Sequence, residues 1–171
     1  MSAEDNQNPL AAHEEGEILV RGSNVMQGYL DRPEETAKTI TADGWLRTGD
    51  LGRMDEDGFV FVTGRIKELI IKGGENIAPR EVDEALLEHD AVLEAAAFAR
   101  PCQNYGQRVE ACVRLKDGRN ASENDLREFC KNLLGAYKTP DHIHFLDDLP
   151  KGPSGKIQRM KLIDLAPAAN G

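Results

Sequence analysis

The pattern of apolar and polar residues is clearest over residues 108–115, "RVEACVRL", where the two kinds alternate. One face of this segment carries Val109, Ala111, Val113 and Leu115, and the other carries Arg108, Glu110, Cys112 and Arg114. A period of two residues predicts a half-buried strand. Apolar runs predict further strands in "GEILVRG" (16–22), "LEAAAFA" (93–99) and "HIHFL" (142–146).

The best-signalled helix is "SENDLREFCKNLLG", residues 122–135. Ser122 and Asp125 fit a capping box, and Gly135 is a suitable stop. Helical spacing predicts one apolar stripe made of Leu126, Phe129, Cys130, Leu133 and Leu134. Three other segments predict helices, namely "RPEETAKTI" (32–40), "PREVDEALLEHD" (79–90) and a short segment from about Arg159. The second of these is expected to bury Val82, Ala85 and Leu86.

Glycines divide the remaining segments. "GRMDEDGFVFVTG" (52–64) predicts a hairpin around an acidic turn. "RIKELIIKGGENIAP" (65–79) predicts an apolar strand, a Gly-Gly turn and a short return strand. "GWLRTGDLG" (44–52), with its three glycines, predicts a loop.

These elements predict an α+β chain without internal repeats. Residues 67–167 alternate helices and strands over about 100 residues, which is typical of a small domain with a mostly antiparallel central sheet and flanking helices. Residues 16–66 hold strands and one short helix, which give only a thin core. We therefore expect them to be the β-rich tail of a larger domain. We expect a disordered leader over residues 1–15 and a short tail over residues 168–171.

Composition narrows the function classes. The chain has 171 residues and a net charge of -9, which argues against a general nucleic-acid or anionic-membrane surface. No apolar run approaches the roughly 18 residues that cross a membrane, and the N-terminus has no secretory pattern. We therefore expect a cytoplasmic protein without a transmembrane segment. Three cysteines without C-x-x-C spacing predict free thiols.

Four features could carry chemistry, although each has an ordinary interpretation when it is taken alone. Lys156, in a Gly/Pro-rich segment, could seek an anion, or it could be an exposed surface lysine. Asp50 in "TGD" could bind two vicinal hydroxyls, or it could bond its own turn. Arg65 could grip a phosphate, and "KGGE" (72–75) could line a narrow passage. The alternating His142 and His144 predict strand-face residues rather than metal ligands.

The order and spacing of these features are more specific than any one of them. "GEILVRG…GYL", "WLRTGDLG", "GRIKELIIKGGENIAPREVDEAL" and "LPKGPSGKIQR" occur in sequence between residue 16 and residue 159. Together they closely resemble the C-terminal third of the adenylate-forming superfamily, and most of all its acyl-CoA ligases. "ARPCQNYGQ" (99–107) departs from the family, because Cys102 and Gln103 stand where acidic residues are usual.

The resemblance implies a two-step reaction and a role for each motif. A carboxylate attacks the α-phosphorus of MgATP to give an acyl-adenylate and pyrophosphate, and the thiol of CoA then displaces AMP. Asp50 and Arg65 would contact the ATP or AMP ribose and phosphate. Lys67 would be the hinge, and Lys156 the catalytic lysine of the first step.

Gly73, Gly74 and Asn76 would belong to the segment that lines the CoA tunnel in the second step. The superfamily's phosphate loop and acyl pocket are absent from these residues, so the resemblance places most of the Mg²⁺ site, and the choice of acid, on a large N-terminal domain. The expected partners are a small carboxylic acid, ATP, CoA and that domain.

Three alternatives accompany this interpretation. The chain could be a stand-alone, non-catalytic module that binds a nucleotide, CoA or a partner protein. It could also belong to a split enzyme, or be a fragment of an amino-acid adenylation domain. As part of a ligase, the isolated chain would be inactive. It would also self-associate through exposed apolar residues, namely Ile18, Val20, Trp45 and Phe59 or Phe61.

Overall fold

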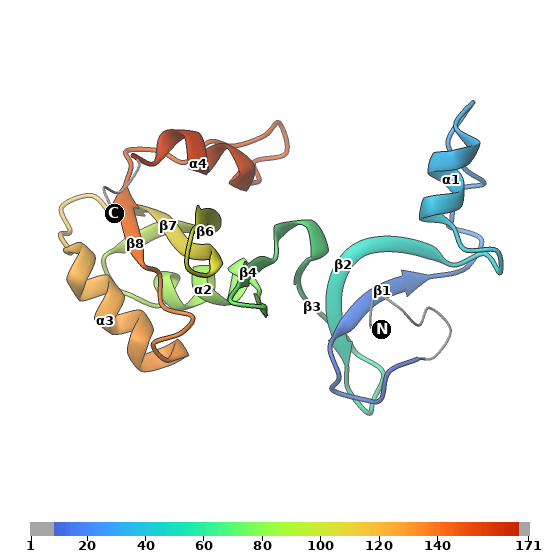
Figure 1. Cartoon of the computed structure of the whole chain (residues 1–171), viewed down its shortest axis with the longest axis horizontal. Helices are drawn as coiled ribbons and strands as arrows, with labels where there is room; N and C mark the ends of the chain where they lie inside the picture. Colours follow the sequence, from blue (N-terminus) through green and yellow to red (C-terminus); the bar gives the residue numbers. More distant parts are fainter. Residues whose placement is uncertain (1–8, 168–171) are drawn as a thin grey trace. The chain divides into compact units, whose positions relative to one another are not determined.

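The computed structural model describes residues 9–167 and divides into two compact units between Lys67 and Glu68. The first unit holds β1 (Gly16–Val20), α1 (Pro33–Thr39), β2 (Leu46–Met54) and β3 (Val60–Arg65). These strands form an antiparallel sheet in the order β1-β2-β3, coloured blue to green in Figure 1. The predicted hairpin over residues 52–64 is confirmed, and α1 begins at Pro33 as predicted.

The prediction of a loop over residues 44–52 is wrong, because most of this segment lies in β2, the central strand of the sheet. Gly52 allows two neighbours to approach closely. A Cβ atom there would lie 2.6 Å from the carbonyl oxygen of Phe61 and 2.7 Å from Cδ1 of Ile18. The glycine that suggested a break in the chain is therefore required for strand packing.

The second unit contains a five-stranded sheet. Its strands are β4 (Ile70–Lys72), β5 (Glu75–Ile77), β6 (Val92–Cys102), β7 (Gly106–Leu115) and β8 (His142–Phe145). The order is β5-β4-β7-β6, and β8 also pairs with β7. Only the β7–β8 pair is parallel among these pairings, so the predicted mostly antiparallel sheet is confirmed.

Helices lie around this sheet (Figure 1). They are α2 (Pro79–Leu87), α3 (Glu123–Leu134) and α4 (Leu162–Leu165), with short 3₁₀ turns η1 (Ile66–Glu68) and η2 (Arg159–Lys161). α2 buries Val82, Ala85 and Leu86 as predicted, and the capping box of Ser122 and Asp125 is present. The stripe on α3 is narrower than predicted. Leu126 and Cys130 are buried, but Leu133 is half-exposed because the helix meets the core along one edge of that stripe.

The prediction that β7 is half-buried is also wrong, because both of its faces are covered. Val109, Ala111 and Val113 pack with α2 and α3 in one apolar cluster. Cys112, on the other face, packs with Leu149 and Leu162 in a second cluster supplied by the C-terminal segment. A strand covered on both faces must also bury its polar residues, and Glu110 is fully buried.

The structure also bears on the expectations for the cysteines, for a transmembrane segment and for the ends of the chain. Cys102, Cys112 and Cys130 are free thiols, and burial raises the pKa of Cys112 and of Cys130 to about 11. In the part of the chain that the structure describes, no helix combines the length and apolar character needed to cross a bilayer. The expected tail over 168–171 and the first eight residues of the expected leader lie outside the described residues.

Candidate active site

The first unit brings two of the predicted site residues together. Asp50 of β2 and Arg65 of β3 are register partners, and Arg65 Nε lies 2.9 Å from Asp50 Oδ1. The Arg65 side chain is 60% exposed and that of Asp50 29%, so both groups face solvent. The ion pair fixes one carboxylate oxygen of Asp50, and the carboxylate keeps further acceptor capacity.

A bulge in β2 sets the direction of Asp50. Glu17 pairs with Leu51 and Leu19 with Arg47, so residues 48–50 stand opposite Ile18 alone. The Thr48 hydroxyl donates to the Ile18 carbonyl (2.8 Å) and accepts from the Asp50 amide (3.0 Å). Gly49 occupies the left-handed region at a φ of 72°. Bulges re-aim side chains, and here "TGD" presents a carboxylate at the end of a strand pair.

The predicted hinge residue lies at the division of the chain. Lys67 is in η1, and the boundary between the two units follows it directly. Short 3₁₀ segments serve as connectors between regular elements.

Lys156 lies in a hydrogen-bonded hairpin of the second unit. Lys151 and Ile157 form a β-bridge, and the Gly152 amide donates to the Lys156 carbonyl (2.8 Å). The Gly155 amide donates to the Gly152 carbonyl (2.9 Å), and Gly155 takes a φ of 78°. Lys156 itself is exposed. The backbone therefore presents the ammonium group from a turn that is closed by hydrogen bonds.

Arg159, three residues after Lys156, makes long-range contacts that the sequence did not predict. Its Nη2 lies 2.7 Å from Asp83 Oδ2 on α2, and its Nε lies 3.1 Å from Glu68 Oε2. It also donates to the Ala97 carbonyl on β6. The side chain is 15% exposed, and burial raises the pKa of Asp83. The final arginine of "GKIQR" was the only sequence signal.

Gly73 and Gly74 form the turn between β4 and β5, as the sequence predicts. Both take positive φ values, 55° and 89°, that favour glycine. Both are exposed, as is Asn76, which is the register partner of Ile71. The predicted tunnel segment is therefore a compact hairpin with an accessible tip.

Arg159 follows the Lys156 hairpin in the sequence and bonds to Glu68 and Asp83, which lie on either side of the Gly73–Gly74 hairpin in the chain. Glu68 lies just before β4, and Asp83 lies on the helix that follows β5. The Gly73–Gly74 hairpin is therefore flanked on both sides by the acidic partners of Arg159. The structure brings Asp50 and Arg65 together in one unit, and in the other Arg159 joins the segment after Lys156 to residues that precede and follow the glycine hairpin.

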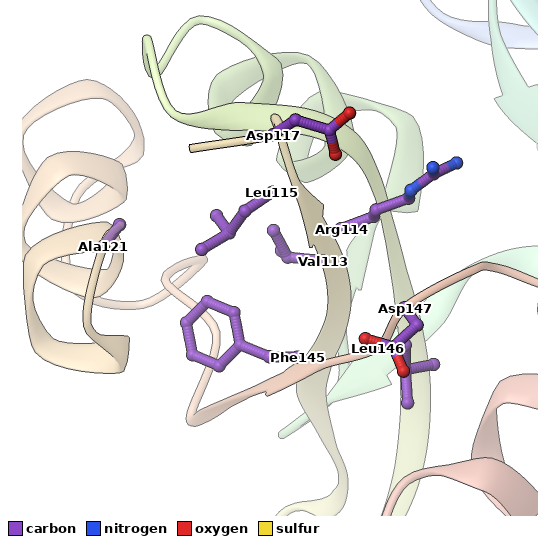
Figure 2. A pocket seen from close by; sticks show the side chains of 8 residues that line it. All are labelled: Val113, Arg114, Leu115, Asp117, Ala121, Phe145, Leu146 and Asp147. Carbon is purple, nitrogen blue, oxygen red and sulfur yellow. The ribbon is translucent and has the colours of Figure 1, made fainter. Parts of the chain in front are cut away.

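A pocket elsewhere in the second unit contains none of the predicted site residues. It lies near the carboxyl ends of β7 and β8, with Val113, Leu115 and Phe145 beside Arg114 and Asp147 (Figure 2). Across residues 9–167, no group of three or more His, Cys, Asp or Glu side chains is placed to hold a metal ion.

The known proteins that this chain resembles indicate one family. The model of the AMP-binding enzyme C-terminal domain matches residues 81–156. A sulfoacetate–CoA ligase from Cupriavidus necator is 54% identical over 88% of this chain, and a 2-succinylbenzoate–CoA ligase from Geobacillus kaustophilus is 47% identical over 93%. The chain spans only 30% and 32% of these two relatives.

Solved structures agree with the sequence relatives. The o-succinylbenzoate CoA synthetase of Bacillus subtilis, in complex with its acyl-adenylate intermediate, matches with a TM-score of 0.84 and 39% identity. ATP-bound MatB from Rhodopseudomonas palustris matches with a TM-score of 0.87 and 35% identity. The matches cover 93% and 91% of this chain, and 32% and 31% of those proteins. This chain belongs to the adenylate-forming enzymes of the acyl-CoA ligase branch and corresponds to their C-terminal portion.

Proposed function

We propose that this chain is the C-terminal part of an ATP-dependent, AMP-forming acyl-CoA ligase. The observation that carries the proposal is that similarity to CoA ligases extends over both units, at 54% identity in one relative. Such an enzyme joins a carboxylic acid to CoA in two steps. The chain supplies the adenylation lysine and the CoA-tunnel hairpin, and it is inactive without the rest of the enzyme.

In the first step, a carboxylate oxygen attacks the α-phosphorus of ATP, and pyrophosphate leaves. Asp50 would accept hydrogen bonds from the two ribose hydroxyls, and the ion pair with Arg65 at 2.9 Å supports this role by orienting the carboxylate. Arg65 retains donors for the ribose or phosphate oxygens. This pair would position the nucleotide, with magnesium bound mainly by groups of the large domain.

Lys156 would stabilise the charge that develops during adenylation. Negative charge spreads over the α-phosphoryl oxygens and the attacking carboxylate, and one ammonium group between them lowers the energy of the transition state. The backbone hydrogen bonds that close the hairpin around Lys156 affect how the lysine would move. The lysine would enter and leave the site with the second unit as a body, rather than by loosening of its own loop.

In the second step, the CoA sulfur attacks the acyl carbonyl carbon, and AMP leaves. The Gly73–Gly74 hairpin would line the passage for the pantetheine arm, because its tip carries no side chains and is exposed. Rotation at Lys67, next to the division between the units, would exchange Lys156 for this hairpin.

The identity of the acceptor in the second step is inferred from the proteins that this chain resembles. The structure of an amide bond synthetase from Marinactinospora thermotolerans also matches this chain, with a TM-score of 0.87 and 35% identity. The two sequence relatives named above are CoA ligases that are 54% and 47% identical to this chain, so CoA is the better-supported acceptor. Supplying an amine in place of CoA tests this choice directly.

The test uses the full-length enzyme that contains this chain. We expect acid-dependent exchange of pyrophosphate into ATP, and formation of a thioester when CoA is added. The variant Lys156→Gln should lower the exchange rate at least 100-fold. Lys161→Gln, the same change at another exposed lysine, should leave it within twofold of the wild-type rate.

Two results would contradict the proposal. Exchange that stays normal in Lys156→Gln would remove the role of Lys156. A full-length protein that binds AMP or CoA but never turns over ATP with any acid would favour the non-catalytic module instead.

A further inference from the structure

Lys72, the residue before the glycine turn, is buried, and the proposed function gives it no role. We propose that Lys72 is a positioning residue that holds the Gly73–Gly74 hairpin in the shape required for CoA to react. This inference rests on the proposed function, because it assigns a role within the second step.

Lys72 is a buried lysine, with only 6% of its surface exposed. Its Nζ lies 3.0 Å from Asp141 Oδ2 and donates to the Tyr137 carbonyl at 3.2 Å. The same nitrogen lies 5.4 Å from the ring centre of Tyr137 and 5.9 Å from that of Tyr105. The ammonium group therefore has an ion-pair partner, a carbonyl acceptor and two aromatic neighbours.

The backbone around Lys72 is bound to the same residues. The Tyr137 hydroxyl donates to the Lys72 carbonyl, and the Gly73 amide donates to the Tyr105 carbonyl at 2.9 Å. Tyr137 thus contacts both ends of Lys72, with its carbonyl on the ammonium and its hydroxyl on the backbone. These contacts tie the first half of the turn to the segments that follow β6 and α3.

The second half of the turn is open. A Cβ atom on Gly73 would lie 3.0 Å from the Tyr137 hydroxyl and 3.4 Å from Cδ1 of Tyr105. A Cβ atom on Gly74 would meet nothing within 4 Å. The two tyrosines therefore close one side of the hairpin, and Gly74 is the side on which a pantetheine arm could pass.

The core holds the base of the hairpin, because Ile70 and Ile77 are buried there and the Ile71 amide donates to Gln107 Oε1 at 2.7 Å. The end nearer the turn has fewer contacts, since β4 pairs with β7 at one position, Lys72 with Gly106. Lys72 is therefore an anchor for the turn rather than for the whole hairpin. Asp141 and Tyr137 lie about 65 residues further along the chain, so Lys72 makes a long-range connection at the base of the turn.

The experiment separates the two half-reactions in the full-length enzyme. Lys72→Met keeps much of the side-chain volume but removes both hydrogen bonds. We expect its KM for CoA to rise at least tenfold, while pyrophosphate exchange stays within twofold of wild type. Lys72→Arg keeps the charge and the donors and should recover most of the affinity.

A control uses a second lysine, which lies next to Tyr137 in the sequence. Lys138 follows Tyr137 and pairs with Glu81 at 2.7 Å, without a contact to the hairpin. Lys138→Met also removes a lysine–carboxylate ion pair, although a more exposed one (39% and 41%), and it should leave both half-reactions within twofold. Asp141→Asn is a milder variant whose side chain is 38% exposed in the wild type, and it should raise the KM for CoA about threefold.

A second readout does not depend on catalysis. Amide hydrogen exchange in the peptide that spans β4 and β5 should become at least tenfold faster in Lys72→Met. Peptides from β7 should exchange at the wild-type rate, because the core residues there are untouched.

The outcomes distinguish the inference from the proposed function. If Lys72→Met and Asp141→Asn keep the wild-type KM for CoA, the positioning role is wrong. It is equally wrong if both half-reactions fall together, which would mean a general role in folding. If the wild-type enzyme performs no acid-dependent exchange, the proposed function fails, and unchanged hydrogen exchange in Lys72→Met would then reject the anchor separately.

Discussion

Glu110 is a buried carboxylate on β7 that bonds to three basic side chains. Arg100 Nε lies 2.6 Å from one of its oxygens and Arg108 Nη2 2.7 Å from the other, while His144 Nε2 lies 2.8 Å from the first. Burial opposes ionisation, but the hydrogen bonds from His144 and Arg100 outweigh it and lower the pKa of Glu110. Arg100 also donates to the Ala166 carbonyl, so the cluster connects the sheet to the C-terminal segment.

The lowered pKa sets the direction of a pH effect on stability. Folded Glu110 binds its proton less readily than the unfolded chain does. Its contribution is therefore complete above the ordinary value of 4.5 and is lost as the pH falls through the lower folded pKa. Glu110→Gln should cost about 3 kcal/mol of unfolding free energy at pH 7, because it leaves two arginines without their carboxylate.

Urea unfolding between pH 7 and pH 3 measures this prediction. The loss caused by Glu110→Gln should shrink below about pH 4.5, since the unfolded wild-type chain then takes up a proton that folded Glu110 binds less readily. Glu128→Gln, at a 70% exposed side chain, provides the control and should change stability by less than about 0.5 kcal/mol. A loss in Glu110→Gln that does not vary with pH would contradict the assignment.

Among the elements, Arg159 is one of the attachments of the Lys156 hairpin to the rest of the second unit. The arginine reaches α2 through Asp83, β6 through the Ala97 carbonyl and η1 through Glu68. Its planar fork serves these acceptors from a single side chain, which a lysine cannot do. The hairpin itself adds Lys151, whose Nζ lies 2.8 Å from Glu94 Oε1 on β6, so Arg159 supplies part of the positioning from outside the hairpin.

Arg159→Lys should lower the unfolding free energy by about 2 kcal/mol, because it leaves buried acceptors on Asp83 and Ala97 without donors. In the full-length enzyme it should reduce pyrophosphate exchange about tenfold, since Lys156 is then held less precisely. Arg119→Lys, at an exposed position, is the matched control. Normal exchange in a folded Arg159→Lys enzyme would show that the attachment does not position Lys156.

For the whole molecule, the important feature is the apolar strand β3 at the edge of its sheet. In β3, Val60 is 54% exposed and Phe61 49%, and Phe59 just before the strand is 67% exposed, so consecutive apolar residues here meet solvent. Ile18, Val20 and Trp45, which the sequence also marked as interface residues, are half-buried. An exposed apolar edge strand is a surface for association, and a larger domain of the proposed ligase would cover it.

The chain on its own should therefore self-associate. Light scattering is expected to give an apparent mass that rises with concentration from one copy toward two. The double variant Phe59→Ser with Phe61→Ser should remain a single copy over the same range. A wild-type chain that stays monodisperse as one copy would contradict this interpretation of the surface.

Local sequence patterns determined most of the elements and the positions of the site residues. Capping residues, helical spacing and glycine turns predicted α2, α3 and both hairpins, because these signals act within a few residues. The motif order identified Asp50, Arg65 and Lys156, although their catalytic roles remain proposals. It also assigned Gly73 and Gly74 to the turn where the structure has them.

Only the tertiary structure decided which faces are covered and which distant residues meet. Residues 44–52 read as a loop because their glycines break a local pattern, yet Gly52 is needed where two strands approach. β7 read as half-buried because alternation cannot show that the C-terminal segment covers its second face. No local pattern marked Lys72 or Arg159 as buried, and their hydrogen-bond partners lie 62 to 91 residues away in the chain. Burial and pairing across such separations depend on the packed chain, so no local pattern could specify them.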